Sequence, residues 1–518
     1  MHRHFDRRSL FRSAGGLVLL GGLLPQRLLA APLGQNPFTL GVAAGDPWPD
    51  GFVIWTRLAP RPFDEHGGMP AAPVPVRWDV AEDDGFVRVV QSGETLARPE
   101  LGHSVHVELR GLRPHRHYWY RFMVAGSDSS PIGMARTAPA AGAVVDRVRI
   151  GVAGCQHWEA GFFDAWRHIA GEPDLDLIFH YGDYIYEGPR LPLGERIVRQ
   201  HIGDEIYSLD DYRRRYAQYK SDPHLQAAHA ASAFAATFDD HEVDNDWAAD
   251  KDQDGTPPEY FHLRRLMALQ AWYEHMPVRR AQLPGLHGII AHRRLDYGRL
   301  LRLHLLDTRQ YRTKQRCGLD GGEHCRPVED GGGSQMLGAA QEAWLDEGLG
   351  GEAGWNLLAQ QVMLMPFRYL ESRAQGRYNL DSWSGYPDAR SRLTQLMQKN
   401  NLTNVVVASG DVHKHHVGLV PMREHDLEGP AAATEYVSSS ISSGGDGSDI
   451  PPGWEDILGE NPHSNLVNDR RGYQLFTIAP GQWRTDVIGL DRVSVRGGNK
   501  HQVAAFVTLP HQPGAHPA

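Results

Sequence analysis

The chain has 518 residues, of which 41% are hydrophobic and 22% charged, a composition typical of a globular protein rather than a disordered or fibrous one. This length exceeds what one hydrophobic core usually organises, so we expect two domains. The formal net charge of -10 disfavours non-specific nucleic-acid binding, because an acidic surface repels the phosphate backbone. Any phosphate group that the protein binds therefore needs a local positive centre, such as metal ions or a few arginines.

The first 31 residues have the pattern of a secretory signal. The adjacent Arg7 and Arg8 precede an apolar stretch at Leu17–Leu24, and small residues suited to cleavage follow it. The paired arginines resemble the twin-arginine type, with an ordinary secretory signal as the alternative. The apolar run is shorter than the roughly 20 residues of a membrane-spanning helix. We expect export by the twin-arginine translocation machinery, a periplasmic or secreted location, and no stable membrane association.

Residues 36–137 contain short runs of alternating polar and apolar residues, separated by glycine and proline. Such alternation is typical of half-buried strands, and many short strands with turns between them indicate an antiparallel sandwich. The segment LRGLRPHRHYWYRF, which starts at Leu109, resembles the end of a fibronectin type III module. We therefore expect a fibronectin-III-like β-sandwich over residues 36–137, followed by an alanine- and proline-rich linker.

From residue 144 onward, apolar strand-like runs alternate with helical ones, which predicts an α/β domain over residues 144–500. The run EYFHLRRLMALQAWYEHM, which starts at Glu259, is rich in aromatic residues and methionine. Its apolar residues have helical spacing. We therefore interpret it as a core helix rather than as a ligand-binding face.

Five polar clusters each follow an apolar run. Four of the runs (RIGVA, LDLIFHY, LRLHLL and VVVAS) have strong strand patterns, and AFAATF has a weaker one. Buried parallel strands appear as continuous apolar runs, and ligands in open α/β sheets bind just outside the carboxyl ends of the strands. We therefore expect the five clusters to converge on one site. They are GCQH (154–157), GDYIYE (182–187), DDHE (239–242), DTRQYR (307–312) and GDVHKHH (410–416).

The three cysteines fall into two groups. Cys317 and Cys325 lie in a polar, glycine-rich stretch, where an oxidising compartment favours a disulfide and two free thiols are the alternative. Cys155 directly follows an apolar run, beside His157. It is either a metal ligand or a small core residue, and its polar neighbours favour the ligand.

The second and third clusters carry acidic groups that suit a cation. Asp183 offers a carboxylate, and Tyr186 lies three residues further on, where a phenolate ligand favours ferric iron. The alternative is a helix-capping aspartate and a packing tyrosine. The run Asp239–Glu242 places three acids around one histidine, and a cation would offset their mutual repulsion. A solvated acidic turn is the alternative for this run.

The last cluster combines carboxylate and imidazole groups, which together form a metal-binding set. Asp411, His413 and His415 are spaced two residues apart, and on an extended backbone this spacing places them on one face. The alternative is a histidine-rich surface loop.

Taken together, the clusters resemble the sequence blocks of the calcineurin-like metallophosphoesterase superfamily. Cys155 and Tyr186 each stand where that superfamily has an aspartate, and Asp240 and Asp411 stand where it has an asparagine and a histidine. These replacements are typical of the PhoD-like alkaline phosphatase/phospholipase D family. The segments DHEVDNDWA, LLDTRQYR, SSSISSGGDG and RRGYQLF also resemble that family. The resemblance implies a β-sandwich N-terminal domain followed by an α/β metallophosphoesterase domain, a four-layer α/β/β/α sandwich.

The resemblance also implies two metal ions held by unlike ligands. Thiolate, phenolate and imidazole groups suit ferric iron (Fe³⁺), and the carboxylates of Asp240 and Asp411 suit calcium (Ca²⁺), with Asp183 shared between the two ions. The candidate metal ligands are Cys155, His157, Asp183, Tyr186, Asp240, Asp411, His413 and His415.

Two further residues are candidates for the chemistry itself. A pair of metal ions polarises the phosphoryl oxygens and lowers the pKa of a bound water, which then attacks in line. His241 is a candidate for protonating the leaving alkoxide or for orienting the phosphate. Arg309 is a candidate for a bidentate phosphate contact, with a structural role at a strand end as the alternative.

We therefore expect a secreted, metal-dependent, alkaline phosphatase-like phosphoesterase that acts on small-molecule phosphate monoesters, diesters or both. One alternative is a phospholipase D-like diesterase acting on phospholipid head groups. A second alternative is a non-catalytic metal-binding surface module, against which the intact ligand set argues. Residues 189–219 and 445–471 are expected to form loops over the site.

Overall fold

The computed structural model describes residues 35–194, 197–315, 333–350, 353–369, 378–423, 426–450 and 453–518. The expected signal segment and the Cys317–Cys325 pair lie outside the described residues. Within the described part of the chain, we find no helix with the length and apolar character needed to cross a membrane.

The larger of the two main sheets has ten strands, and its central strands β8, β9, β10 and β1 run parallel. Val152 of β8 lies opposite Phe179 of β9 in this register. The strand order is β21 (Gln512–Pro517), β20 (Lys500–Leu509), β19 (Gln482–Leu490), β18 (Gly472–Ala479), β8 (Val148–Ala153), β9 (Leu177–His180), β10 (Ala233–Ala236), β1 (Val42–Trp48), β2 (Gly51–Arg57) and β5 (Ser104–Glu108).

The second main sheet has seven strands, and its strands β12, β13, β14 and β16 are parallel. The strand order is β11 (Arg293–Tyr297), β12 (Leu301–Leu305), β13 (Trp355–Ala359), β14 (Val405–Ser409), β16 (Ala431–Val437), β15 (His415–Pro421) and β17 (Ser464–Asn468). Both sheets therefore contain a parallel core flanked by antiparallel strands, and these cores contain the apolar runs that precede the polar clusters.

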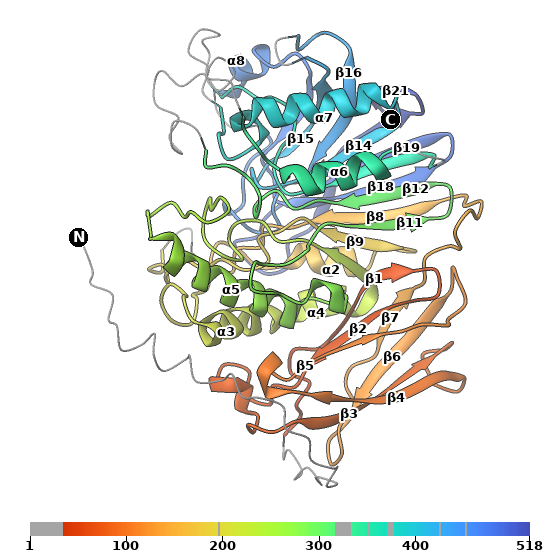
Figure 1. Cartoon of the computed structure of the whole chain (residues 1–518), viewed down its shortest axis with the longest axis vertical. Helices are drawn as coiled ribbons and strands as arrows, with labels where there is room; N and C mark the ends of the chain where they lie inside the picture. The colour runs from red at the N-terminus through yellow and green to blue at the C-terminus, as the bar shows by residue number, and fades with distance from the viewer. Residues whose placement is uncertain are drawn as a thin grey trace.

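The N-terminal strands divide between two sheets. A separate antiparallel sheet has the order β4 (Val89–Ala97), β3 (Val74–Ala81), β6 (His117–Met123) and β7 (Gly133–Arg136), and it forms the lower end of the molecule in Figure 1. Strands β1, β2 and β5 instead extend the ten-stranded sheet, because β1 pairs in parallel with β10. The strands of the expected β-sandwich thus fall into two sheets, one of which continues into the ten-stranded sheet of the following domain.

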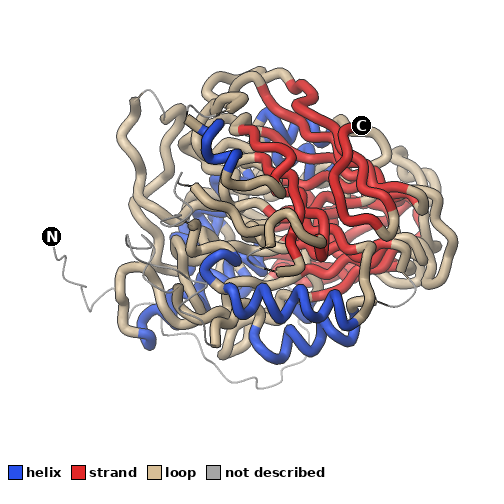
Figure 2. Tube along the Cα trace, turned by 90° about the horizontal axis from the view of Figure 1, so that it is seen from above, coloured by secondary structure: helices blue, strands red, loops and turns tan. Residues whose placement is uncertain are grey.

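Hydrophobic clusters show how the layers pack. Successive side chains of a strand point to opposite faces, so Phe179 of β9 joins a cluster that it shares with Leu357 and Val406 of the second sheet. Its neighbour Ile178 faces the other way, toward the helices near the ten-stranded sheet. In Figure 2 the strands lie stacked together, with helices and loops around them.

The helices cover the outer faces of the sheets. Helices α2 (Asp164–Ala170), α3 (Leu209–Lys220), α4 (Pro223–Ala231) and α5 (Pro258–His275) share a hydrophobic cluster with the ten-stranded sheet. Helices α6 (Gly338–Gly348) and α7 (Pro387–Lys399) share another with the seven-stranded sheet, to which α8 (Trp454–Gly459) adds partly buried side chains. Short 3-10 turns lie at η1 (Glu65–Gly68), η2 (Pro99–Leu101), η3 (Arg280–Gln282) and η4 (Trp383–Gly385). The aromatic residues Phe261 and Trp272 of α5 are fully buried in its cluster, which confirms α5 as a core helix.

Candidate metal centre

The five polar clusters follow the ends of strands β8, β9, β10, β12 and β14, and several of their residues have a left-handed backbone. Cys155, Asp183, Asp411 and His413 have φ angles of 49°, 53°, 71° and 55°. Positive φ is uncommon outside glycine and costs free energy, so it persists where the surrounding structure enforces it, often at functional sites. These turns aim the side chains away from the strand direction and toward one another.

The ring of Tyr181 lies between the turns that follow β8 and β14. A Cβ atom at Gly154 or at Gly410 would collide with this ring, so only glycine fits at either position. The Tyr181 hydroxyl donates a 2.6 Å hydrogen bond to the carbonyl oxygen of Ser439. The segments that carry Cys155 and Asp411 thereby pack against one aromatic side chain.

One group of side chains combines sulfur, oxygen and nitrogen donors. Candidate ligand atoms of Cys155, Asp183 and His413 lie within 4.8 Å of one another. The hydroxyl oxygen of Tyr186 lies 2.8 Å from Asp183 Oδ2 and 3.2 Å from His413 Nε2. Burial, followed by the neighbouring Asp183, raises the pKa of the Cys155 thiol well above its usual value. A bound cation would offset the cost of ionising this thiol.

A second group contains only carboxylates. Ligand atoms of Asp239, Asp240 and Asp411 lie within 4.8 Å of one another, and those of Asp240, Asp246 and Asp381 form a further group of this kind. Burial raises the pKa of Asp239 to about 8, and burial with the nearby Asp239 raises that of Asp411 well above its usual value. Buried carboxylates this close together repel one another unless cations balance them.

The residues present fit a pair of metal ions. Among the described residues, the buried oxygens Asp183 Oδ1 and Asp239 Oδ2 lack hydrogen-bond partners. Unpaired buried carboxylate oxygens are costly, and metal coordination is one way to satisfy them. Thiol, phenol and imidazole groups of Cys155, Tyr186 and His413 meet at Asp183, and ligand atoms of Asp240 and His241 also lie within 4.8 Å of it.

Arg309 lies beneath the carboxylates and is fully buried. Its Nε is 2.5 Å from Asp239 Oδ1, its Nη1 is 2.6 Å from Asp381 Oδ2, and Asp240 and Asp411 lie within 4.0 Å. Burial lowers the pKa of Arg309, but these carboxylates outweigh burial and raise it well above its usual value. The structure therefore places its guanidinium group against carboxylates, as a fixed counter-charge.

His241 forms a pair with Glu187. Its Nδ1 lies 2.7 Å from Glu187 Oε2, and its ring lies 4.1 Å from the ring of Tyr186. Although burial lowers the pKa of His241, Glu187 and Asp240 raise it well above its usual value. The side chain of His241 keeps 20% of its surface exposed, and one of its ring nitrogens lies within 4.8 Å of ligand oxygens of Asp183 and Asp240.

Two candidate ligands lie outside these groups in the described part of the chain. The ring of His157 lies 4.3 Å from that of Tyr186, and its Nδ1 accepts a hydrogen bond from the backbone of Glu159. His415 is fully buried at the start of β15, and its Nδ1 accepts a 3.1 Å hydrogen bond from the backbone of Ser439. In this arrangement both histidines border the centre.

Several residues of the centre escaped the sequence reasoning. The carboxylate of Glu242 accepts hydrogen bonds from the backbone nitrogens of Tyr184 (2.6 Å), Asp239 (2.9 Å) and Asp183 (3.2 Å), so it joins the turns after β9 and β10. Glu187 and Glu242 end the clusters GDYIYE and DDHE, so the sequence could have marked both as candidate residues of the centre. Asp381 follows no apolar strand run and carries no such signal.

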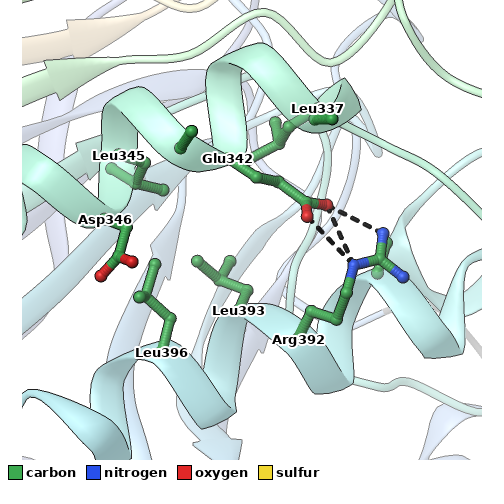
Figure 3. A pocket seen from close by; sticks show the side chains of 10 residues that line it. Leu337, Glu342, Leu345, Asp346, Arg392, Leu393 and Leu396 are labelled. Carbon is green, nitrogen blue, oxygen red and sulfur yellow. Dashed lines mark hydrogen bonds and ion pairs between the residues drawn. The ribbon is translucent and has the colours of Figure 1, made fainter.

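A cavity of about 300 Å³ lies elsewhere, between α6 and α7. Figure 3 shows leucines from both helices in its lining, with Glu342 and Arg392 paired at one end. None of the candidate ligands lines this cavity.

The comparisons with known proteins agree with this geometry. Residues 150–487 match the family model of the PhoD-like phosphatase, and residues 24–139 match that of the PhoD-like phosphatase N-terminal domain. The chain is 42% identical over 521 residues to alkaline phosphatase D of Bacillus subtilis (strain 168), covering 98% of this chain and 88% of that protein. A solved structure titled "Structure of PhoD" aligns with a TM-score of 0.90 at 42% identity, over 93% of this chain and 92% of that one.

The fold, the site and these matches define a phosphoric ester hydrolase. The chain belongs to the PhoD-like phosphatase family, which confirms the resemblance drawn from the sequence motifs.

Proposed function

We propose that this protein is an exported, metal-dependent phosphoesterase that hydrolyses phosphate monoesters, diesters or both through a metal-activated water. The observation that carries the proposal is the group around Asp183, where thiol, phenol, imidazole and carboxylate donors lie within coordination range of one another. The N-terminal twin-arginine pattern supports export to the periplasm or beyond.

We propose unlike metals on the two sides of Asp183. Cys155, Tyr186 and His413 would hold ferric iron, because thiolate, phenolate and imidazole suit that ion. Asp240 and Asp411 would hold calcium, which accepts several carboxylates and waters. Bound together, the two ions would polarise the phosphoryl oxygens and lower the pKa of a coordinated water.

The protein's own side chains orient this chemistry. Glu187 holds His241 by its Nδ1, which leaves the other ring nitrogen free to donate a proton to the leaving alkoxide. Glu187 also accepts a 2.8 Å hydrogen bond from the backbone nitrogen of Asn245, so the carboxylate is itself fixed. The buried guanidinium group of Arg309 keeps the carboxylates of Asp239 and Asp381 in place through ion pairs.

The test is release of p-nitrophenol from p-nitrophenyl phosphate, a monoester, and bis-p-nitrophenyl phosphate, a diester, with metal analysis of the same preparation. We expect hydrolysis of at least one substrate by protein that contains iron and calcium, and loss of hydrolysis in Asp183→Asn. Metal-replete protein that cleaves neither substrate would contradict the proposal, whereas a strong preference for the diester would define the substrate class.

A further inference from the structure

The segment SSSISSGGDG, which follows β16, lies against the centre and has no part in the chemistry described so far. Its five serines are almost completely buried, at 0% to 2% exposure. They are Ser438, Ser439, Ser440, Ser442 and Ser443. Buried hydroxyl groups are costly unless they are hydrogen-bonded, so the partners of each serine indicate what the segment does.

Ser443 has partners on two turns that carry candidate ligands. Its Oγ lies 2.6 Å from the hydroxyl oxygen of Tyr186 and 2.7 Å from the carbonyl oxygen of Cys155, and its single proton goes to one of these two acceptors at a time. The backbone nitrogen of His157 donates a 3.2 Å hydrogen bond to the same Oγ. One hydroxyl group thus joins the turn after β8 to the turn after β9.

Arg471 fixes the serine segment from the other side. Its Nη1 donates a 3.0 Å hydrogen bond to Ser440 Oγ and a further one to the carbonyl oxygen of Ser443. Its Nη2 pairs with Asp469 Oδ1 at 2.6 Å. Gly447 has a φ of 66°, and a Cβ atom there would collide with the carbonyl oxygen of Asp469. The close approach of these two backbone segments therefore requires glycine at position 447. Arg471 of RRGYQLF therefore fixes the segment SSSISSGGDG through these hydrogen bonds.

The oxygen of Tyr186 has three hydrogen-bond partners among the described residues. Two of them, Asp183 and His413, are themselves candidate ligands. The third is the hydroxyl of Ser443, a neutral group that is able to donate. A phenol oxygen that serves as a metal ligand has no proton to give, so its contact with Ser443 requires the serine to turn its one proton from the carbonyl oxygen of Cys155 to the phenolate, the stronger acceptor.

We propose that Ser443 is a positioning residue for Tyr186, which holds the phenol oxygen toward Asp183 and His413 and donates a hydrogen bond to it. This inference rests on the proposed function, because it assumes that Tyr186 binds the iron. Hydrogen bonds from the outer shell fix the orientation of a ligand and its electron donation to the metal. The hydrogen bonds from Arg471 to Ser440 and to the Ser443 carbonyl oxygen keep Ser443 in place.

The experiment compares the visible absorption maximum and the resonance Raman tyrosinate bands of the iron-loaded wild type, Ser443→Ala and Ser442→Ala. Ser442 is the matched control, because its Oγ donates a 2.8 Å hydrogen bond to the carbonyl oxygen of His157 and no described hydrogen bond to Tyr186. We expect Ser443→Ala to shift the absorption maximum to longer wavelength, since a phenolate without the donor is more electron-rich. Its iron affinity or activity should fall by about 10- to 100-fold. Ser442→Ala should keep the wild-type spectrum.

Each outcome decides the question. An unchanged spectrum in Ser443→Ala, or the same shift in Ser442→Ala, would overturn the role of Ser443. If Ser443→Ala does not fold, Ser443→Thr keeps a hydroxyl group and should keep the wild-type maximum, and a shifted maximum there would also overturn it. An iron-loaded wild type without a tyrosinate band would instead contradict the proposed iron ligand, and with it this inference. Release of p-nitrophenol from the monoester and the diester would show separately whether the hydrolase proposal stands.

Discussion

Burial raises the pKa of Asp183 to about 7 and that of Asp239 to about 8, even though Arg309 lies against Asp239. Raised pKa values mean that the protein alone binds protons where a cation would bind instead. Metal binding must therefore displace protons below these pKa values. We expect calcium affinity to rise as the pH increases from below 7 to above 8, measured by isothermal titration calorimetry with proton release followed in two buffers. An affinity independent of pH would show that Asp183 is not a calcium ligand.

The donor set of Cys155 and Tyr186 leads to a prediction about colour. Thiolate or phenolate bound to ferric iron absorbs in the visible range, so the purified protein should be coloured. The all-oxygen calcium site should exchange more readily, so EGTA should abolish activity while the colour persists, and added calcium should restore activity. Tyr186→Phe should shift or bleach the band, and Cys155→Ala should reduce the iron content. A colourless, fully active protein containing only zinc would contradict the ligand assignment.

The pairing of His241 with Glu187 predicts a change in the pH profile. Glu187 raises the pKa of His241, so His241 stays protonated to higher pH, and activity that needs this proton is lost only as the pH rises past that pKa. Glu187→Gln should therefore move the alkaline limb of the kcat profile to lower pH. His241→Ala should lower kcat by about 10²–10⁴-fold, with metal content unchanged. Loss of metal from His241→Ala would identify it as a ligand, and an unmoved limb in Glu187→Gln would reject the pairing.

Among the elements, the turns after β9 and β10 depend on one carboxylate. Glu242 is fully buried and accepts from three backbone nitrogens, and Glu242→Ala would leave these donors unsatisfied. Each buried unsatisfied group costs about 1–3 kcal/mol, so we expect a loss of at least about 3 kcal/mol in the free energy of unfolding, measured with urea. Metal content should fall in parallel. A variant of wild-type stability would mean that water or another group takes over these bonds.

The apolar runs predicted the strands well. VVVAS coincides with β14, and LDLIFHY contains β9, because an uninterrupted apolar run of strand length is typical of a parallel strand buried on both faces. The period-two argument for the last cluster was less successful. Asp411 and His413 have positive φ, so the backbone there is not extended, and β15 begins only at His415. The side-chain direction of His415 could not be predicted from spacing alone.

The pairing of residues distant in the chain also escaped prediction. Glu187 meets His241 across 54 positions, and Arg309 meets Asp239 across 70. Neither pair has a local pattern, because each forms only after the strand ends are brought together. The sequence therefore predicted which clusters would meet but not which side chains within them would pair.

For the whole molecule, the N-terminal strands act as part of the catalytic sheet. Ala44 and Gly45 of β1 pair with Ala233 and Phe234 of β10, and the Trp55 indole nitrogen donates a 3.0 Å hydrogen bond to the carbonyl oxygen of Glu274. A chain that starts at residue 144 would expose the edge of β10 and an apolar surface beside it.

We expect that fragment to aggregate, or to unfold at much lower temperature than the whole chain, as measured by size-exclusion chromatography and circular dichroism. Supplying residues 35–143 as a separate chain should partly restore it. A monomeric fragment with wild-type metal content would show that the two parts fold independently.

Ser443 and its partner Cys155 lie far apart along the chain, which limits when the metal centre can form during synthesis and export. Cys155 and Ser443 are separated by 288 positions, and the strands between them are β9 and β10 of the ten-stranded sheet and β11 to β16 of the seven-stranded sheet. A growing chain that has not yet reached Ser443 therefore lacks part of the centre, and the proposed ions would bind only after that point. A protein that crossed a membrane as an unfolded chain would meet its metals only outside, where iron is scarce and calcium plentiful. A protein that crosses in the folded state would carry its iron with it from the cytoplasm, where metal loading can be controlled.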